Sequence, residues 1–372
     1  MNRMKILLLG DASNYHVALA KGLRTLGHDV TVASNGSKWM KTPRDIDLYR
    51  HEHMLSGALL YARISTVLAS RLKGYDIVQM VSPGFVDLRP SLLERILRRL
   101  RRDNGALYLS ALGTDAAFVR NLIGPHPALG FSEWREGNAL SPWAKSPEAQ
   151  LDKWLKKNLQ QYNDLFYNTV DGVVSALYEY HKVIEAEYPH VPMVYGGIPV
   201  DRDALPAMRI RPDGEKVKIL YAVHRSRVAE KGADKLRPLL DRLVEEMPQD
   251  VEIVAPPNMP YRDFIRALAD ADMVCDQLYS YTPATTALLG MAMGVVPISG
   301  GEELFYDFIG EDTLRPVFNP DPRDLEGTYA RLRALVADRA ALRRMSVEAP
   351  AFVERHNDAV TVARRFIDFW TR

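Results

Sequence analysis

Three basic side chains lie where a phosphate-bearing ligand would need them. Arg225, Arg227 and Lys231 follow the apolar run 217–223, which has the composition of a buried strand. A guanidinium group binds two phosphate oxygens at once, and a lysine adds a point charge. Ligands of open α/β sheets bind beyond the carboxyl ends of the strands. We therefore predict that these side chains bind a diphosphate. A solvated basic loop is the alternative interpretation.

A hydroxyl-rich turn comes before a helix of small residues. Thr282 is a good N-cap residue, and Pro283 suits the first position of a helix. A helix that begins there presents free N–H groups and the positive end of its dipole to an anion. The residues predicted to line the phosphate and sugar region are Tyr281, Thr282, Ala284 and Thr285. Taken alone, the stretch fits a capped core helix equally well.

The elements that must position these residues form two α/β halves. Short apolar runs alternate with helical stretches, which implies parallel strands covered on both faces. The predicted strands are 4–10, 29–34, 75–80, 106–113, 172–177, 191–197, 217–223, 251–256, 272–277 and 294–300. The predicted helices include 59–72, 91–102, 147–166, 324–335, 339–345 and 351–370. The fold class is therefore α/β, with two Rossmann-like doubly wound domains that face each other across a cleft.

A proline-rich, charged stretch at 199–215 has the composition of a linker. We predict an N-terminal domain over 1–205 that binds the acceptor, a C-terminal domain over 206–350 that binds the donor, and a final helix over 351–372 that crosses back to the first domain. Residues 134–146 have no clear period; they form either part of an acceptor site or a plain surface connection.

Composition narrows the class of protein. The 372 residues carry a net charge of +1, which argues against binding of nucleic acid through the overall charge of the protein. The one cysteine, Cys275, can form no internal disulfide, and a reducing cytoplasm is expected. The start of the chain is interpreted as a first strand and not as a signal peptide. No segment approaches the roughly 18 apolar residues of a membrane span.

One helix is strongly basic. Across 90–102 an apolar stripe of leucine and isoleucine faces away from Arg95, Arg98, Arg99, Arg101 and Arg102. Such a helix can lie on an anionic membrane, which would place the protein at the inner membrane face. The same pattern fits a helix that covers the core and exposes a solvated basic side. Both interpretations are open.

Several stretches of the second half resemble GT-B glycosyltransferases, especially the retaining family 4 (glycosyl transferases group 1). "ILYAVHRSRVAEKGADKL" (219–236) is similar to that family's strand, basic loop and Lys-Gly helix start. "ALLGMAMGVVPISGGEE" (287–303) resembles its Glu-Ala-Met-Ala-x-Gly-x-Pro segment, with the proline one place later. The stretches 261–280, 317–346 and 352–370 fit the family's remaining pattern.

The resemblance implies a retaining hexosyltransferase that moves a sugar from a nucleotide donor to a glycan, lipid-linked or small-molecule acceptor. It implies no cofactor and no metal, and a UDP-sugar is favoured over a GDP-sugar. The leaving diphosphate takes the acceptor's proton, so stabilisation of its charge carries the catalysis. In that sense Arg227 and Lys231 are catalytic candidates, with Arg225 beside them. The base is expected near 255–263, flanked by Tyr261.

The chain departs from the family at two glutamates, whose places fall on Tyr281 and Leu289. Ribose recognition must then be rebuilt. The nearest acids are Glu302 and Glu303, which follow a predicted strand. They are candidates for donor hydroxyls, and Glu302 also for catalysis. A carboxylate that complements a helix dipole is the equally weighted alternative.

In the first half, the loop with Asp11, Ser13, Asn14 and His16 resembles the lining of a glycosyltransferase acceptor site. One glycine there does not make the three-glycine dinucleotide fingerprint, which disfavours a nicotinamide dehydrogenase.

Thr114 and Asp115 resemble the Gly-Ser/Thr-Asp of many relatives. Asp115 either orients an acceptor hydroxyl, as a catalytic candidate, or caps a helix. A non-catalytic binder of sugar nucleotides or glycans and a sugar-nucleotide epimerase are the competing functions.

Overall fold

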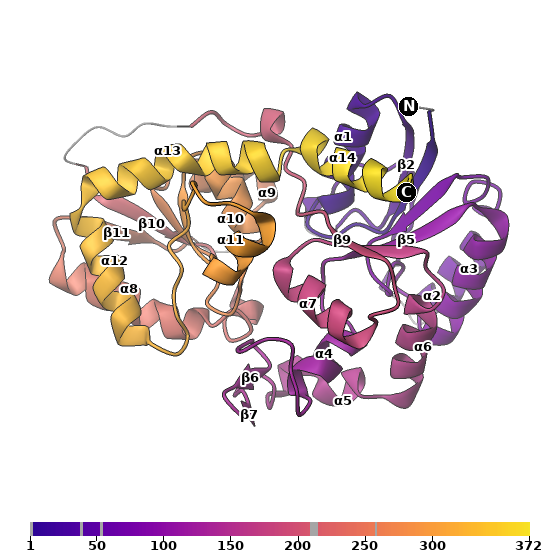
Figure 1. Cartoon of the computed structure of the whole chain (residues 1–372), viewed down its shortest axis with the longest axis horizontal. Coiled ribbons are helices and arrows are strands. Elements are labelled where there is room, and N and C mark those ends of the chain that lie inside the picture. Colours follow the sequence, from indigo (N-terminus) through magenta and orange to yellow (C-terminus); the bar gives the residue numbers. More distant parts are fainter. Residues whose placement is uncertain (1–2, 38–39, 53–54, 209–214, 257–258) are drawn as a thin grey trace. The chain divides into compact units, whose positions relative to one another are not determined.

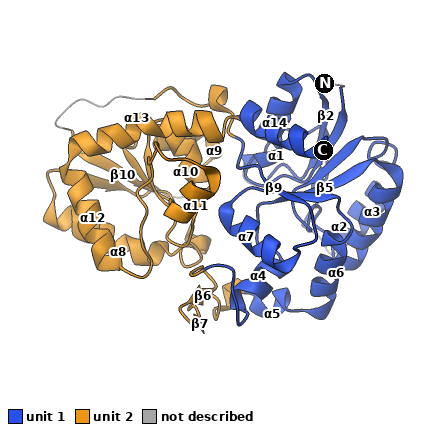
Figure 2. Ribbon diagram, viewed as in Figure 1, with its two compact units in different colours: residues 1–129, 150–199, 359–372 blue, residues 130–149, 200–358 orange. Residues whose placement is uncertain are grey.

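The computed structural model describes residues 3–37, 40–52, 55–208, 215–256 and 259–372. Within them the chain forms two compact units (Figure 2). Unit 1 comprises 1–129, 150–199 and 359–372, and unit 2 comprises 130–149 and 200–358. The predicted α/β class with two Rossmann-like halves is confirmed. The cleft and the domain boundaries at 205/206 and 350/351 stay predictions.

Unit 1 contains a parallel seven-stranded sheet in the order β3-β2-β1-β4-β5-β8-β9. The strands are β1 Lys5–Leu9, β2 Asp29–Ser34, β3 Ile46–Asp47, β4 Ile77–Met80, β5 Ala106–Ala111, β8 Gly172–Ser175 and β9 Met193–Tyr195. The central strands are near-continuous apolar runs because helices cover both faces of the sheet.

The helices of unit 1 are α1 Tyr15–Thr25, α2 Ser56–Ser65, α3 Pro90–Asp103, α4 Ala116–Ile123, α5 Leu151–Trp154, α6 Lys157–Tyr167, α7 Tyr178–Glu187 and α14 Ala359–Trp370. Helices α2, α3 and α6 bury their apolar faces in one core cluster on the sheet (Figure 1). Helices α1 and α14 pack together closely at Gly22, where a Cβ atom would lie 2.0 Å from the Ala359 oxygen.

A chain of buried hydrogen bonds ties α14 to the loop after β1. Trp370 Nε1 donates to Gln79 Oε1 (3.1 Å), and Gln79 Nε2 donates to Ser110 Oγ (3.0 Å). His16 Nε2 lies 3.2 Å from Ser110 Oγ, and its Nδ1 lies 2.7 Å from the Gly10 oxygen. A carbonyl can only accept, so Nδ1 carries the proton and Nε2 accepts from the serine. The C-terminal helix is thus an integral part of unit 1.

Unit 2 contains a parallel four-stranded sheet in the order β11-β10-β12-β13 and a small hairpin. The strands are β10 Val217–Tyr221, β11 Val251–Val254, β12 Met273–Cys275, β13 Val296–Ile298, and the hairpin pair β6 Arg135–Glu136 and β7 Ala139–Leu140. The helices are α8 Ala233–Glu246, α9 Tyr261–Ala269, α10 Thr285–Ala292, α11 Glu303–Ile309, α12 Leu325–Ala337 and α13 Arg339–His356. Residues 130–149, which carry the hairpin, pack with this unit.

Four predicted helices have different bounds. The predicted helix 351–370 is divided between α13 and α14, which Asn357 and Asp358 separate. The stretch 339–345 continues to His356 as α13, because Phe352 and Val353 are fully buried and their packing outweighs Pro350 inside the helix. The predicted helix 147–166 is broken, since Gln150 is left-handed (φ 49°) and Lys156 is extended. It forms a short turn, α5 and α6. Helix α2 also begins and ends earlier than the predicted 59–72.

Candidate active site

A buried charged pair lies at the carboxyl ends of the strands of unit 2. Lys231 Nζ is 2.6 Å from Asp276 Oδ1, and Ser299 Oγ donates to the other oxygen, Oδ2, at 3.1 Å. Asp276 follows β12, Ser299 follows β13, and Lys231 stands in the loop between β10 and α8. The Asp276 side chain is 1% exposed and that of Lys231 is 15%. A buried carboxylate therefore holds the ammonium in place, while part of the Lys231 side chain remains exposed to solvent.

Glycine at position 232 makes this placement sterically possible. Gly232 is the N-cap of α8 with a left-handed φ of 65°. A Cβ atom there would lie 2.8 Å from side-chain carbons of both Leu278 and Tyr279. The backbone N–H of Leu278 donates to the Lys231 oxygen at 2.7 Å. The lysine loop thus lies directly against the loop that follows β12, and only glycine permits that approach.

The two arginines of the predicted trio do not join this cluster. Arg227 forks the carboxylate of Glu230, with Nε and Nη2 at 2.9 and 2.7 Å from its oxygens, and its side chain is 53% exposed. Arg225 is exposed on the one-turn 3₁₀ helix Arg225–Arg227. The sequence places all three cations at one strand end, but the structure brings only Lys231 to the buried carboxylate. Their roles toward a diphosphate stay predictions.

The predicted start of the small-residue helix is wrong. Helix α10 begins at Thr285 with Ala284 as N-cap, and not at Pro283 with Thr282 as N-cap. The turn is instead bound to its neighbour, because the Glu302 N–H donates to the Tyr281 oxygen and Ser280 Oγ donates to the Thr282 oxygen.

A Cβ atom at Gly300 would lie 2.7 Å from the Thr282 nitrogen, which shows how closely the two loops pack. Tyr281 and Thr282 are buried, while Ala284 and Thr285 are partly exposed. This packing keeps the chain extended through Ala284, where the N-cap has no side-chain hydrogen bond.

Tyr281 stacks on an aromatic residue that sequence reasoning did not single out. Its ring lies 4.3 Å from that of Phe131 at an interplanar angle of 11°, and its hydroxyl accepts the Phe131 N–H at 3.0 Å. Glu136 of the same segment accepts hydrogen bonds from Lys235 and Tyr279. Residues 130–149 therefore cover the position of the family's first glutamate. No local sequence signal marks a contact across 150 positions.

The two acidic candidates have different surroundings. Glu302 is the N-cap residue of α11, and its carboxylate accepts from Asn319 Nδ2 at 2.7 Å. Asn319 in turn accepts the Gly301 N–H at 3.1 Å. Glu303 lies in the first turn of α11 and is largely exposed, 3.4 Å from Arg315. The position of Glu303 suits the dipole interpretation, whereas Glu302 is part of an ordered polar group.

Tyr261 begins α9 and, like Leu289, packs against a core cluster that includes Leu220 of β10 and Val274 of β12. Burial raises the pKa of its hydroxyl. Of the segment expected to hold the base, residues 257–258 lie outside the described part of the chain.

In unit 1, the loop after β1 has buried and strained members. Asp11 is buried and accepts from the His16 N–H and the Thr42 hydroxyl, while burial raises its pKa. Ser13 and Asn14 have φ values of 53° and 68°, uncommon for residues with side chains. His16 is fully buried, and burial lowers its pKa to about 4. Both ring nitrogens of His16 are engaged, which favours a structural role over the predicted acceptor contact.

Asp115 is the N-cap of α4. Its carboxylate accepts from the Phe118 N–H at 2.8 Å and from the Tyr167 hydroxyl at 2.7 Å, and burial raises its pKa. The capping interpretation therefore accounts for its position. Thr114, one residue earlier, is partly exposed at the end of β5.

Among the described residues, no group of three or more His, Cys, Asp or Glu side chains is arranged to hold a metal ion. No helix within the described ranges has the length and apolar character needed to cross a bilayer. Metal-independence and the cytoplasmic location stay predictions.

Comparison with known proteins gives a shared fold. No protein-family model matches the chain, and no curated protein sequence matches it. Sucrose-phosphate synthase from Thermosynechococcus elongatus is similar over 99% of this chain and 98% of its own, with a TM-score of 0.63 and 12% identity. HepE from Anabaena in complex with UDP-glucose is similar over 99% and 100%, with a TM-score of 0.58 and 13% identity.

An α-glucosyltransferase in complex with UDP and a DNA 13-mer matches over the full length of both chains, with a TM-score of 0.58 and 13% identity. Because that complex contains DNA, it gives no support to the expectation that the chain avoids nucleic acid. The chain thus has the GT-B fold of these glycosyltransferases.

Proposed function

We propose that the protein is a retaining glycosyltransferase of the family 4 type that uses a UDP-sugar donor. The observation that carries the proposal is the Lys231–Asp276–Ser299 cluster at the carboxyl ends of β10, β12 and β13, on a fold shared with enzymes solved with UDP or UDP-glucose. This edge of a parallel sheet is where such folds bind nucleotides. The hexosyl type of the transfer is part of the proposal.

The charge of the diphosphate would be balanced by the basic loop. Asp276 already neutralises Lys231, so additional positive charge must come from Arg225 and Arg227. Arg227 would exchange Glu230 for a phosphate. This exchange gives up only an exposed ion pair, worth about 0–1 kcal/mol. Lys231 would contribute an ammonium that Asp276 holds in a fixed direction.

The proposed reaction breaks the bond between the anomeric carbon and the diphosphate oxygen. The acceptor oxygen forms its bond to that carbon on the same face, and the acceptor's proton passes to the leaving phosphate. No protein base is required, and the basic residues lower the barrier by stabilising the departing negative charge. Glu302 would contact the sugar and phosphates together with Tyr281, Thr282, Ala284 and Thr285, whose loop accepts the Glu302 N–H at the Tyr281 oxygen. Tyr261 would contact the base.

The acceptor, a glycan, a lipid-linked glycan or a small molecule, would bind at the strand ends of unit 1. Ser13, Asn14 and Thr114 retain accessible surface there, while Asp11 and Asp115 shape the loops that carry them. We place the protein in the cytoplasm and propose a metal-independent reaction. The predicted contact with an anionic membrane concerns α3 of unit 1, whereas the proposed donor site is built from residues of unit 2.

Calorimetric titration with UDP and GDP tests the donor site. We expect UDP to bind, and R225A/R227A and K231A each to weaken binding by roughly 1.5–3 kcal/mol, the range for charge-assisted hydrogen bonds. K218M is the matched control, because Lys218 stands on β10 and pairs with the half-exposed Asp270. Unchanged affinity in both variants, with a native circular dichroism spectrum, would mean that the diphosphate binds elsewhere.

A non-catalytic binder is the second candidate, and one observation favours it. Tyr281 and Leu289 replace the family's two glutamates, and Tyr281 is buried against Phe131. Incubation with a panel of nucleotide sugars distinguishes the two functions. Release of free UDP in the presence of acceptors supports the transferase. Tight binding of the nucleotide sugar without release, across the acceptor panel, supports the binder.

A further inference from the structure

Helix α2 of unit 1 has a second apolar side, which faces solvent. Its inner side buries Leu60 and Ile64 in the core. Residues 55, 58, 59 and 62, all leucine or alanine, repeat at helical spacing on the outside and are exposed. Leu55 and Leu59 are 68% and 58% exposed, and Val67 just beyond the helix is 70% exposed. An exposed apolar stripe of this length marks an interaction surface.

The same surface is strongly basic. Segments 55–73 and 89–103 together hold nine arginines and lysines against two acidic residues, Glu94 and Asp103, while the whole chain has a net charge of +1. Arg95, Arg99 and Arg102 follow one another at helical spacing along α3, and Arg95 is exposed. Segment 55–73 has no acidic residue. Four of the α3 arginines (98, 99, 101 and 102) are in ion pairs with Glu94, Asp103 or Asp171, whereas Arg63 of α2 and Arg95 of α3 are exposed.

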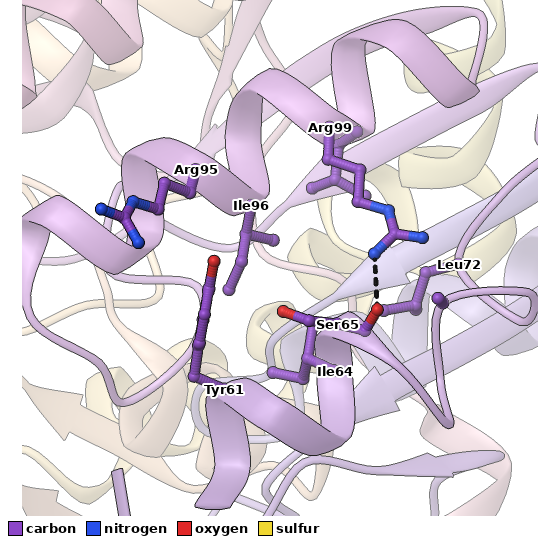
Figure 3. A pocket seen from close by; sticks show the side chains of 9 residues that line it. Tyr61, Ile64, Ser65, Leu72, Arg95, Ile96 and Arg99 are labelled. Atoms are coloured by element: carbon purple, nitrogen blue, oxygen red, sulfur yellow. Dashed lines mark hydrogen bonds between the residues drawn. The ribbon is translucent and has the colours of Figure 1, made fainter. Parts of the chain in front are cut away.

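A pocket of about 160 Å³ lies between the two helices. Its walls are Ile64, Leu72, Ile96 and Leu100, and its rim carries Tyr61, Arg95 and Arg99. Figure 3 shows Arg95 and Tyr61 at one side of the pocket, and the Arg99 guanidinium donating to the Ser65 oxygen of α2 at 2.9 Å. This volume is below the roughly 300–1,000 Å³ of whole-ligand sites. The pocket would take one part of a larger amphiphile.

We propose that the α2–α3 surface, made of Leu55, Leu59, Val67, Tyr61, Arg63, Arg95 and Arg99, docks on a bilayer that carries anionic phospholipid. The exposed leucines and valine enter the headgroup region, and the arginines meet lipid phosphates, with Arg95 and Arg99 at the pocket rim. The apolar stripe of α3 itself is not the inserting part, because Leu93, Ile96, Leu97 and Leu100 are buried in the core. Of the two interpretations of this helix, the one that covers the core accounts for its own apolar stripe.

The arrangement fits a membrane better than a protein partner of mixed charge. Apolar burial and attraction to anionic lipid act together at such surfaces, and each basic residue near the surface strengthens binding about fivefold. Arginine side chains extend past an apolar layer to reach phosphates. The proposal concerns unit 1 alone and does not depend on the proposed donor site.

Co-sedimentation of the full chain with vesicles tests the proposal. We expect binding to vesicles of phosphatidylcholine and phosphatidylglycerol in equal parts, little binding to phosphatidylcholine alone, and weakening by added salt. R95E should reduce binding at least fivefold, and L59S/V67S roughly tenfold. The matched controls are R344E and V347S, which change an exposed arginine and a 58% exposed valine of α13 in unit 2 and should bind as the unchanged protein does.

Two kinds of outcome overturn the proposal. Binding that ignores lipid charge, or that R95E and the α13 variants alter equally, would refute docking by this surface. A dimer in light scattering that L59S/V67S dissociates, with no vesicle binding, would assign the surface to a second copy of the chain. If L59S/V67S fails to fold, R95E decides alone, because its side chain is exposed and its loss leaves the core intact.

Discussion

Removal of the Lys231 ammonium should destabilise unit 2 far more than removal of an ordinary lysine. In K231M the Asp276 carboxylate, 1% exposed, keeps one side-chain donor among the described residues, the Ser299 hydroxyl. A buried carboxylate that loses its cation costs about 3–5 kcal/mol. Methionine retains the length and apolar stem of lysine, so little of this loss comes from packing.

The double variant separates charge from shape. K231M/D276N removes both charges and leaves a neutral amide that can still bond to Ser299. Because replacing a whole buried pair is far less costly than breaking it, the double variant should recover at least about 2 kcal/mol relative to K231M. The control is K218M, whose ammonium lies 2.7 Å from Asp270, a side chain that is 43% exposed. That substitution should cost less than about 1 kcal/mol.

Hydrogen exchange of the β10 and β12 amides, followed by mass spectrometry, is the suitable assay. It measures the free energy of opening within unit 2, which a single unfolding curve of a two-unit chain does not isolate. Equal protection in K231M and K218M, or no recovery in the double variant, would refute the view that Asp276 is a buried carboxylate dependent on Lys231.

Three further predictions concern other contacts. Burial lowers the pKa of His16 from 6.5 to about 4, so the unfolded chain takes up a proton first as the pH falls. The free energy of unfolding of unit 1 should therefore fall by about 3 kcal/mol between pH 6.5 and 4. In urea titrations H16Q should show a smaller decrease over this pH range, and an equal decrease would contradict the prediction. Burial alone would raise the pKa of Glu311, but hydrogen bonds from His356 and Thr313 hold it well below 4.5, so its contribution to stability should be present above pH 4.5 and decline in acid, with E311Q insensitive. Y281F leaves the buried Phe131 N–H without its acceptor and should cost about 1–3 kcal/mol in the melting of unit 2, whereas Y279F, at a partly exposed ring, should cost less.

The strands were predictable because a strand that is buried on both faces has apolar residues along its whole length. The run 5–9, Lys-Ile-Leu-Leu-Leu, and the run 217–221 are short, apolar and followed by turn residues, and both are parallel strands. Helix ends were less predictable because packing sets them. Pro350 marks a local stop, yet α13 continues because Phe352 and Val353 are buried.

The site was predictable only in its local part. Lys231 stands at a strand end because it follows β10 and precedes a glycine that begins α8, and both features are visible in sequence. Its partner Asp276 lies 45 positions away, and Phe131 lies 150 positions from Tyr281. These contacts follow from the order of the strands and from the path of 130–149, which no residue pattern specifies. Thr282 has the side chain of a good N-cap residue, but the loop 300–302 packs against its backbone and the helix begins only at Thr285.

The loop after β12, with Tyr281, and the loop after β13, with Glu302, lie close together. Their contact indicates how a chain without the family's glutamates would hold a sugar. The Glu302 N–H donates a hydrogen bond to the backbone oxygen of Tyr281. Glu302 therefore lies next to Tyr281, the position at which the family's first glutamate is replaced. Asn319 fixes that carboxylate, and Gly300 allows the approach because any side chain there would meet the backbone of Ser280. An acid supplied from the loop after β13 could thus take the place of one supplied from the loop after β12. An acid that holds sugar hydroxyls acts on the sugar and not on the nucleotide. E302Q should therefore weaken binding of the UDP-sugar and slow UDP release, while the affinity for UDP alone stays nearly unchanged; an unchanged affinity for the UDP-sugar would exclude this role.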